Sequence, residues 1–253
     1  MASVASARVK RVSWGALVNY MRGEWDQGAH VTIVGPTKSG KTHIALALLE
    51  LRSYAVVIAT KRKDPLVQAL HREGYEVVRD SLKRRITWTQ DGEPLQAKIV
   101  LWPTVKDGSG ILARKRVQAH VIGEALDWLD EVGGFTILLD ECMYLADSLR
   151  LREQLGELWY SGRTQRISLI ACAQRPVMIP RLAFSQARFL FLARTGDKAD
   201  LERIRDIASV IPREIVEETV MGLDAGAHEF AFVDSEAGVI ARVIAPPPEK
   251  RGR

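Results

Sequence analysis

The chain has 253 residues, of which 47% are hydrophobic and 26% charged, and its formal net charge is +5. These values fit an ordinary globular protein whose core needs no covalent or metal staple. No apolar run approaches the ~18 residues of a membrane span, and the basic N-terminus lacks the apolar core of a secretory signal. Cys142 and Cys172 lie in apolar runs with neither disulfide nor CxxC spacing, so a cytoplasmic protein is expected.

Short apolar runs alternate along the chain with segments of helical spacing. Strands are predicted at 31–34, 54–59, 75–79, 135–139, 167–173 and 188–193, and helices at 42–51, 66–72, 112–132, 150–160, 198–208 and 212–221. The buried stripe of the long helix is expected to consist of Val117, Val121, Leu126 and Leu129. Alternating runs around residues 90–94 predict a hairpin or an edge strand pair, and residues 228–234 and 239–244 predict a terminal hairpin.

This alternation also predicts the architecture. Fully apolar strands between helices indicate an α/β fold with a mostly parallel central sheet that helices cover on both faces. The sequence contains neither an internal repeat nor a long linker. We therefore expect a single domain over residues 1–245 and a disordered, basic tail over residues 246–253.

A phosphate-binding loop is predicted between the first strand and the first helix. The pattern GxxxxGK[ST] is matched by Gly35, Pro36, Thr37, Lys38, Ser39, Gly40, Lys41 and Thr42. Gly35 and Gly40 allow backbone torsions that point the loop's amide hydrogens at phosphates, at the positive end of the following helix. Lys41 is expected to lie between the β- and γ-phosphates of ATP, and the hydroxyl of Thr42 to ligate Mg²⁺. Lys38 either contacts phosphate or stays solvated.

A second element is the apolar strand 135–139, which runs into the adjacent carboxylates Asp140 and Glu141. Carboxylates at the C-terminal ends of buried parallel strands face the ligand crevice. Asp140 is therefore expected to hold Mg²⁺ through a water molecule, and Glu141 to orient or deprotonate the attacking water. An acid directly after the Walker-B aspartate is typical of the additional-strand, catalytic-glutamate branch of P-loop ATPases. This predicts a RecA-like motor or remodelling ATPase.

A third element is the buried strand 167–173, which ends in the polar residue Gln174. In the catalytic-glutamate branch, a strand inserted between the two Walker strands ends in such a sensor residue. Gln174 is accordingly expected to contact the γ-phosphate or the attacking water. The alternative is that Gln174 merely caps its strand.

These three elements together resemble the FtsK–HerA superfamily of DNA-translocating ATPases. That family has a Walker-B DE, a helix, a segment of the form GR…GI.LI.ATQRP, and a strand with an arginine. The chain has LLDE at Leu138–Glu141, SGRTQRISLIACAQRP at Ser161–Pro176 and ARFLFLAR at Ala187–Arg194. It departs from the family at Ala173, where the family has threonine, and at Arg166, where the family has glycine.

The resemblance implies a homo-oligomeric ring of five or six subunits with ATP at each interface. An arginine of one subunit would then reach the neighbour's γ-phosphate and stabilise charge in the transition state. Arg163 matches this role best, and Arg166 and Arg194 are weaker candidates. A compact ATPase of this kind is similar to viral and phage genome-packaging ATPases. Such a protein would work on double-stranded DNA in the host cytoplasm, with a capsid or portal-vertex protein as a further partner, and could stay with the virion.

Three basic clusters could contact DNA phosphates without reading sequence. They are Lys61-Arg62-Lys63, Lys83-Arg84-Arg85 and Arg114-Lys115-Arg116. Each could equally be a solvated face. Trp88 and Trp102 lie near the second cluster, and core packing is the favoured role for both over stacking on bases.

Two other functions remain open at this stage. One is a nucleotide or small-molecule kinase, which would need an acceptor pocket and an arginine-rich lid. The other is an ATPase that drives secretion or virion assembly without DNA. Stimulation of ATP hydrolysis by double-stranded DNA would separate a translocase from a kinase.

Overall fold

The computed structural model describes residues 9–105, 108–205, 207 and 210–247. The predicted tail lies outside them from residue 248 onward. Contacts divide the chain into two compact units. Unit 1 consists of Met1–Asp26, Val31–Leu48 and Ala173–Arg253, and unit 2 consists of Gln27–His30 and Leu49–Cys172. The single domain predicted over 1–245 stays a prediction.

Unit 2 is built on parallel strands. They are β3 (Ala55–Ile58), β4 (Glu76–Val78), β5 (Lys98–Leu101), β6 (Thr136–Leu139) and β7 (Ser168–Ala173, whose last residue belongs to unit 1). Their order is β7-β6-β3-β5-β4, and every neighbouring pair is parallel. The cores of β3, β5, β6 and β7 are fully buried, as with Ile99, Ile137 and Leu169 at 0% exposure. Uninterrupted apolar runs produce this arrangement because both faces of a parallel sheet are covered.

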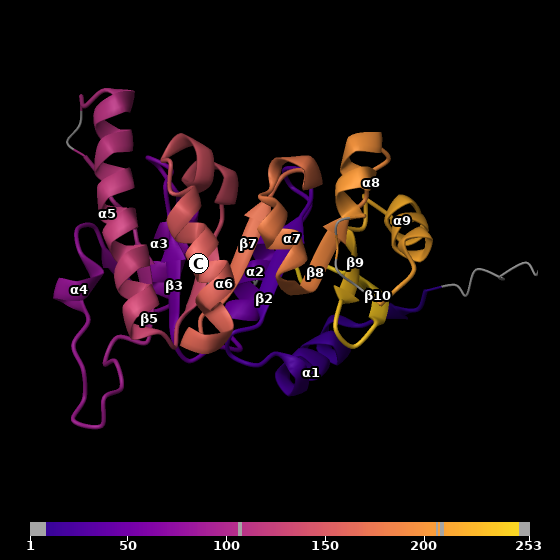
Figure 1. The fold of residues 1–253 in the computed structure, drawn as a ribbon, viewed down its shortest axis with the longest axis horizontal. Coiled ribbons are helices and arrows are strands. Elements are labelled where there is room, and N and C mark those ends of the chain that lie inside the picture. The colour runs from indigo at the N-terminus through magenta and orange to yellow at the C-terminus, as the bar shows by residue number, and fades with distance from the viewer. Residues whose placement is uncertain (1–8, 106–107, 206, 208–209, 248–253) are drawn as a thin grey trace, which may run out of the picture. The chain divides into compact units, whose positions relative to one another are not determined.

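The helices of unit 2 cover these strands. They are α3 (Pro65–Arg72), α4 (Leu82–Arg85), α5 (Ile111–Val132), α6 (Arg152–Gln165) and the π-helix η1 (Tyr144–Ser148). The long helices α5 and α6 pack side by side across one face of the strands (Figure 1). The buried stripe of α5 differs from the prediction: Val117 and Val121 are only half-buried, and Gln118 and Ile122 are buried instead. Gln118 tolerates burial because its amide donates to the carbonyl of Thr60 and accepts from Tyr144.

Unit 1 has a mixed strand arrangement. Its strands are β1 (Arg11–Val12), β2 (His30–Val34, whose first residue belongs to unit 2), β8 (Ala187–Ala193), β9 (Glu229–Asp234) and β10 (Val239–Ile244). Their order is β1-β10-β9-β8-β2. β9 and β10 form the predicted C-terminal hairpin, with Val239 opposite Asp234. The core is aromatic: Phe191 and Phe232 are buried, with ring centroids 5.3 Å apart.

The helices of unit 1 are α1 (Trp14–Glu24), α2 (Lys41–Leu49), α7 (Arg181–Ser185), α8 (Lys198–Ile204) and α9 (Arg213–Met221), with a 3-10 turn η2 (Pro176–Met178). Helix α1 was not predicted from the sequence. Its start signal is Ser13, whose hydroxyl accepts from the N–H of Ala16 at the helix N-cap. Within the described part of the chain, no helix is both long and apolar enough to cross a membrane.

The hairpin predicted around residues 90–94 is present but short. Trp88 bridges Pro94, and the N–H groups of Thr89 and Leu95 donate to the carbonyls of Glu93 and Thr87. Lys98–Leu101, which follows the hairpin, pairs in parallel with β3. The consecutive apolar residues of that run suit a strand that is buried on both faces. Trp88 is 43% exposed and therefore lies outside the core, although it contacts the ring of Trp128. Both cysteines are buried, and neither forms a disulfide among the described residues.

Candidate functional site

The predicted phosphate loop joins β2 to α2 in unit 1, and its two glycines are sterically required. A Cβ on Gly35 would lie 2.6 Å from Cβ of Ala193 and 2.8 Å from Oγ of Ser39. Gly40 has a φ of +104°, in the region that side chains disfavour. The N–H of Gly35 donates to the carbonyl of Ala173 at 3.1 Å, which fixes the start of the loop. The loop is therefore held tightly while its outer residues stay exposed.

Lys41 folds back over this loop. Its ammonium Nζ donates to the carbonyl oxygens of Gly35 at 2.6 Å and Pro36 at 2.9 Å. Oγ of Ser39 is buried and has no hydrogen-bond partner among the described residues. A positive charge, an unsatisfied hydroxyl and the N-terminus of α2 thus converge on one turn. This donor set fits an anion with several oxygens, such as a polyphosphate.

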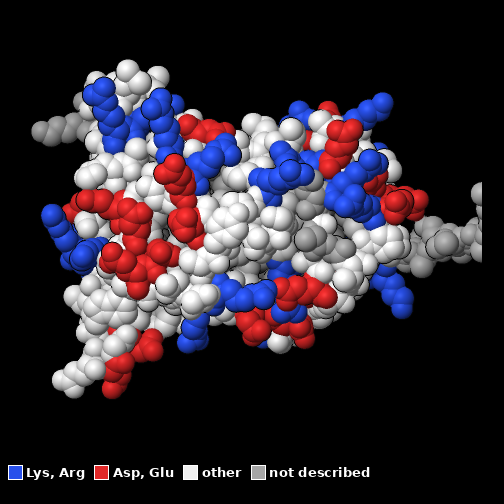
Figure 2. Space-filling view, viewed as in Figure 1, with Lys and Arg blue, Asp and Glu red and all other residues white. Residues whose placement is uncertain are grey.

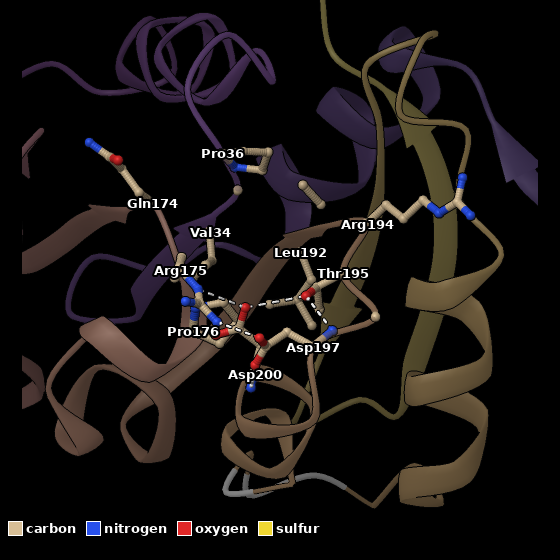
Figure 3. A pocket seen from close by; sticks show the side chains of 13 residues that line it. Val34, Pro36, Gln174, Arg175, Pro176, Leu192, Arg194, Thr195, Asp197 and Asp200 are labelled. Atoms are coloured by element: carbon tan, nitrogen blue, oxygen red, sulfur yellow. Dashed lines mark hydrogen bonds and ion pairs between the residues drawn. The ribbon is translucent and has the colours of Figure 1, made fainter.

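Two cavities flank the loop within unit 1. One, of about 340 Å³, is lined by Gly35 and Pro36 on one side and by Gln174, Arg175 and Arg194 on others (Figure 3). The structure thus brings the predicted sensor Gln174 to the predicted phosphate loop.

The second cavity has about 360 Å³ and runs from Lys38–His43 to His228 and Pro246–Pro247. An imidazole and two prolines offer flat, mostly apolar surfaces of the kind that bind a nucleobase. Sequence analysis did not single out His228 or Pro246–Pro247. Their only local signal is that they flank the terminal hairpin, far along the chain from the loop.

Arg175, the residue after Gln174, serves the structure of unit 1. Its guanidinium pairs with Asp200 at 3.1 Å and with Asp197 at 3.0 Å, and Thr195 also donates to Asp200. Figure 3 shows these side chains converging on one wall of the cavity, whereas Gln174 and Arg194 extend away from them on either side. Arg175 thereby anchors the chain next to Gln174, and the exposed amide of Gln174 stays available to a ligand.

The two predicted acids lie in unit 2, directly after β6, and share one lysine. Nζ of Lys61 lies 3.1 Å from a carboxylate oxygen of Asp140 and 3.2 Å from one of Glu141. The side chain of Asp140 is 13% exposed, that of Glu141 35% and that of Lys61 48%. Partial burial disfavours the ammonium ion, but the two carboxylates outweigh that effect and raise the pKa of Lys61. Lys61 is therefore a firmly charged counter-ion for both acids.

Topology explains why Lys61 reaches these acids. β3 and β6 are adjacent and parallel, with Ile58 opposite Leu139, so the residues that follow the two strands meet at one edge. The turn after β3 is also fixed by its backbone: Trp102 donates its indole N–H to the carbonyl of Lys61 at 2.8 Å. Sequence analysis placed Lys61 only in a basic cluster. Its position shortly after a strand that could neighbour β6 was the signal that could have linked it to Asp140.

The donor atoms available suit Mg²⁺. Within the described residues, no group of three or more His, Cys, Asp or Glu side chains is arranged to hold a metal. Mg²⁺ is commonly held by one or two protein oxygens together with water and substrate phosphates. The carboxylate of Asp140 and the hydroxyl of Thr42 are hard oxygen ligands of that kind. Each residue, Thr42 in unit 1 and Asp140 in unit 2, therefore carries an oxygen of the kind that the predicted metal prefers.

Arg163 lies in the last turn of α6 and is exposed. The helix continues to Gln165 and ends at Arg166, whose φ is +55°. The carbonyl of Gln165 accepts from the N–H of Gly134, which precedes β6. Arg163 is thus near the amino ends of the unit 2 strands, whereas Asp140 follows a carboxyl end. It cannot serve the acids of its own unit 2.

The basic clusters differ in their surroundings. Lys61, Arg62 and Lys63 share a cavity of about 210 Å³ with Arg114 of the third cluster and with Trp102. We call this the basic pocket. By contrast, Lys83 and Arg84 share a cavity with acidic residues of α5, namely Glu124, Asp127 and Glu131. Trp102 is half-buried, and its ring lies 5.4 Å from the guanidinium carbon of Arg79.

Charge is also segregated along α5. Figure 2 shows Lys and Arg gathered around the beginning of this helix, and Asp and Glu over its later turns. The first turn contains no acid and the last turn no base. This pattern opposes the helix dipole, which favours anions at the N-terminus and cations at the C-terminus by about 0.3–1 kcal/mol each. The basic end is therefore not explained by the stability of the helix.

Comparison with protein-family models and with curated proteins finds no match to the sequence. Solved structures do share the fold. The genome-packaging NTPase B204 of Sulfolobus turreted icosahedral virus 2, in complex with sulfate, has a TM-score of 0.61 at 16% identity, over 87% of this chain and 98% of B204. Its complex with ATP-gammaS has a TM-score of 0.59 at 16% identity, over 88% and 98%.

The cytoplasmic domain of the type VII secretion ATPase EccC of Thermomonospora curvata is similar as well. Its TM-score is 0.55 at 14% identity, over 90% of this chain and 26% of the EccC chain. At these identities the likeness shows the fold. The predicted class, an α/β P-loop ATPase fold with a mostly parallel sheet and a C-terminal hairpin, is confirmed.

Proposed function

We propose that this chain is an ATP-driven double-stranded DNA translocase of the FtsK–HerA type, which packages a genome as a ring of five or six subunits. The observation that carries the proposal is the phosphate loop. Lys41 lies over its carbonyl oxygens, Ser39 has an unsatisfied hydroxyl, and cavities open on either side. B204, a genome-packaging NTPase solved with ATP-gammaS, shares the fold.

In this proposal each site residue has one task. The loop amides and Lys41 bind the β- and γ-phosphates, and Thr42 and Asp140 hold Mg²⁺, which neutralises phosphate charge when bound. Glu141 orients the attacking water and accepts its proton, and Gln174 contacts the γ-phosphate. Arg163 serves a neighbouring subunit in the ring, in keeping with its distance from the acids of its own unit 2.

The DNA contact rests on charge. Phosphate neutralisation by Lys and Arg gives affinity without sequence preference, which a translocase needs. The basic pocket and the basic beginning of α5 bring such residues together in unit 2. Because the charge pattern of α5 opposes its own dipole, an external polyanion is the simplest reason for it. The Lys83–Arg85 cluster is the weaker candidate, since acids line the same cavity.

The wider setting follows from the same proposal. A packaging motor acts in the host cytoplasm on a capsid or portal-vertex protein, and it could remain with the virion. The chain is proposed to fold as a single ATPase domain over residues 1–245.

A secretion or assembly ATPase is the second candidate, because the fold is shared with the secretion ATPase EccC. The test is the rate of ATP hydrolysis with and without double-stranded DNA, together with the mass of the assembly in a non-hydrolysable ATP analogue. A translocase is expected to hydrolyse ATP several times faster with DNA and to form a closed ring. A rate that DNA leaves unchanged would favour the secretion ATPase and overturn the DNA proposal.

A further inference from the structure

Lys61 belongs to two neighbourhoods of unit 2 at once. Its ammonium pairs with Asp140 and Glu141 at 3.1 and 3.2 Å, and the same residue lines the basic pocket with Arg62, Lys63 and Arg114. The carbonyl of Lys61 is fixed by Trp102, another residue of that pocket. Its side chain is 48% exposed and has a flexible four-carbon stem. The backbone is therefore anchored, while the ammonium can pair either with the two acids or with an anion in the basic pocket.

The ammonium cannot pair with the two acids and with an anion in the basic pocket at the same time. An ammonium within 3.2 Å of both acids offsets one of their two negative charges and adds little to the pocket's attraction for phosphate. A divalent cation on Asp140 carries twice the charge and competes for the same oxygen. Once it binds, the Lys61 ammonium is repelled by the metal and is free to turn toward an anion in the basic pocket.

We propose that Lys61 is an exchangeable counter-ion that couples the acid pair to a phosphate-backbone site in the basic pocket. Metal-bound nucleotide at Asp140 releases Lys61, and the released ammonium raises the affinity of the basic pocket for a nucleic-acid backbone. This inference rests on the proposed function, since it takes Asp140 as a metal ligand and DNA as the polyanion. It adds the residue that links nucleotide state to DNA affinity.

Reciprocity sharpens the proposal. If metal-bound nucleotide raises DNA affinity by some factor, DNA must raise the affinity for that nucleotide by the same factor. Couplings of this kind are commonly about 5- to 150-fold. Removing Lys61 should abolish the coupling, whereas removing another cation of the pocket should weaken DNA binding and leave the coupling intact.

The first experiment measures the Kd of a labelled DNA duplex, at one salt concentration, with and without Mg²⁺ and a non-hydrolysable ATP analogue. In the wild type the duplex should bind about fivefold tighter or more with the nucleotide. Lys61→Gln should reduce this ratio to below about twofold. The matched control, Lys63→Gln, should bind DNA more weakly in both states with the wild-type ratio. A wild-type ratio in Lys61→Gln would overturn the coupling.

The second experiment measures the Mg²⁺ concentration that half-saturates binding of a fluorescent ATP analogue, without DNA. The metal displaces the ammonium in the wild type, so Lys61→Gln should need several times less Mg²⁺ and Lys63→Gln the wild-type amount. An increased requirement in Lys61→Gln would mean that Lys61 helps to bind the nucleotide, which contradicts the exchange. Thermal unfolding of each variant establishes that it is folded.

The two experiments separate this inference from the proposed function. If nucleotide binds but DNA binds in neither state, the DNA part of both fails, and the Mg²⁺ titration still decides the ion exchange. If both ligands bind and the two affinities are independent, the proposed function stands and the role of Lys61 falls.

Discussion

The phosphate loop of unit 1 and the acid pair of unit 2 are built in different ways. Backbone conformation and backbone contacts fix the loop. Two glycines allow its torsions, and its lysine donates to carbonyl oxygens five and six residues away. Side-chain contacts fix the acid pair, and its counter-ion Lys61 is 79 residues from Asp140 along the sequence. The first depends on local torsions and is preorganised. The acid pair depends on which strands are neighbours, and we propose that its counter-ion can be replaced by another cation.

This difference gives the two regions different vulnerabilities. Changes in the loop should remove binding, whereas changes around the acid pair should alter turnover and its coupling to other subunits. Each prediction below would break or sharpen that contrast, from the largest expected effect to the smallest.

Arg163 would extend the acid site across a subunit boundary. Arg163→Ala should bind ATP normally and hydrolyse it about 10³-fold more slowly, as expected for an arginine that stabilises transition-state charge in trans. The measurement is the hydrolysis rate of wild-type and mutant subunits mixed at different ratios. Loss of activity should exceed the mutant fraction, because each mutant subunit also silences a neighbour. If activity falls only in proportion to that fraction, Arg163 does not act between subunits.

Glu141 tests whether binding and turnover separate. Glu141→Gln keeps the size of the side chain but removes the proton acceptor, so turnover should fall by about 10²- to 10³-fold while nucleotide affinity changes little. Nucleotide titration and phosphate release measured on the same sample would check this. Turnover near the wild-type rate would remove Glu141 from its proposed role.

The same contrast explains how far sequence alone could go. The residue spacing within one stretch was enough to predict a loop at Gly35–Thr42, because a sequence of that pattern has few ways to fold between a strand and a helix. The strand cores were also predictable from their apolar runs. The partnership of Lys61 with Asp140 was not, since it needs the strand order. The parallel pairing of β5 with β3 was not predicted for the same reason.

His30 offers a pH test of unit 2. It is buried with both ring nitrogens in use: Nε2 lies 3.2 Å from the carbonyl oxygen of Trp159, and Nδ1 accepts from the N–H of Leu169 at 3.0 Å. Burial lowers the pKa of His30 to about 4. The unfolded chain, with a pKa of about 6.5, binds the proton first, so stability should fall as the pH drops from about 6.5 to 4.

The loss attributable to His30 should be on the order of 3 kcal/mol. Urea unfolding at pH 7 and pH 4.5 measures it. His30→Gln should lack most of this pH dependence, and His120→Gln, an exposed control on α5, should keep it. Equal pH dependence in all three proteins would contradict the assignment.

The basic clusters test which part of unit 2 meets DNA. Charge reversal of Arg62 and Lys63 should weaken duplex binding several-fold and reduce the slope of log K against log salt by about 2. Reversal of Lys83 and Arg84 should do less, because acids already share their cavity. Binding of a labelled duplex over a salt series compares the two. A larger effect at Lys83 and Arg84 would move the DNA contact to α4.

The most direct test of the account is nucleotide binding by the loop itself. A fluorescent ATP analogue should bind the wild type and Arg22→Ala with similar affinity, since Arg22 is an exposed residue of α1 outside the loop and the two cavities that flank it. Lys41→Ala should lower the affinity for the analogue at least about a hundredfold, because it removes the positive charge that is proposed to bind the phosphates. Unchanged binding in a folded Lys41→Ala protein would contradict the assignment of Gly35–Thr42 as the nucleotide site.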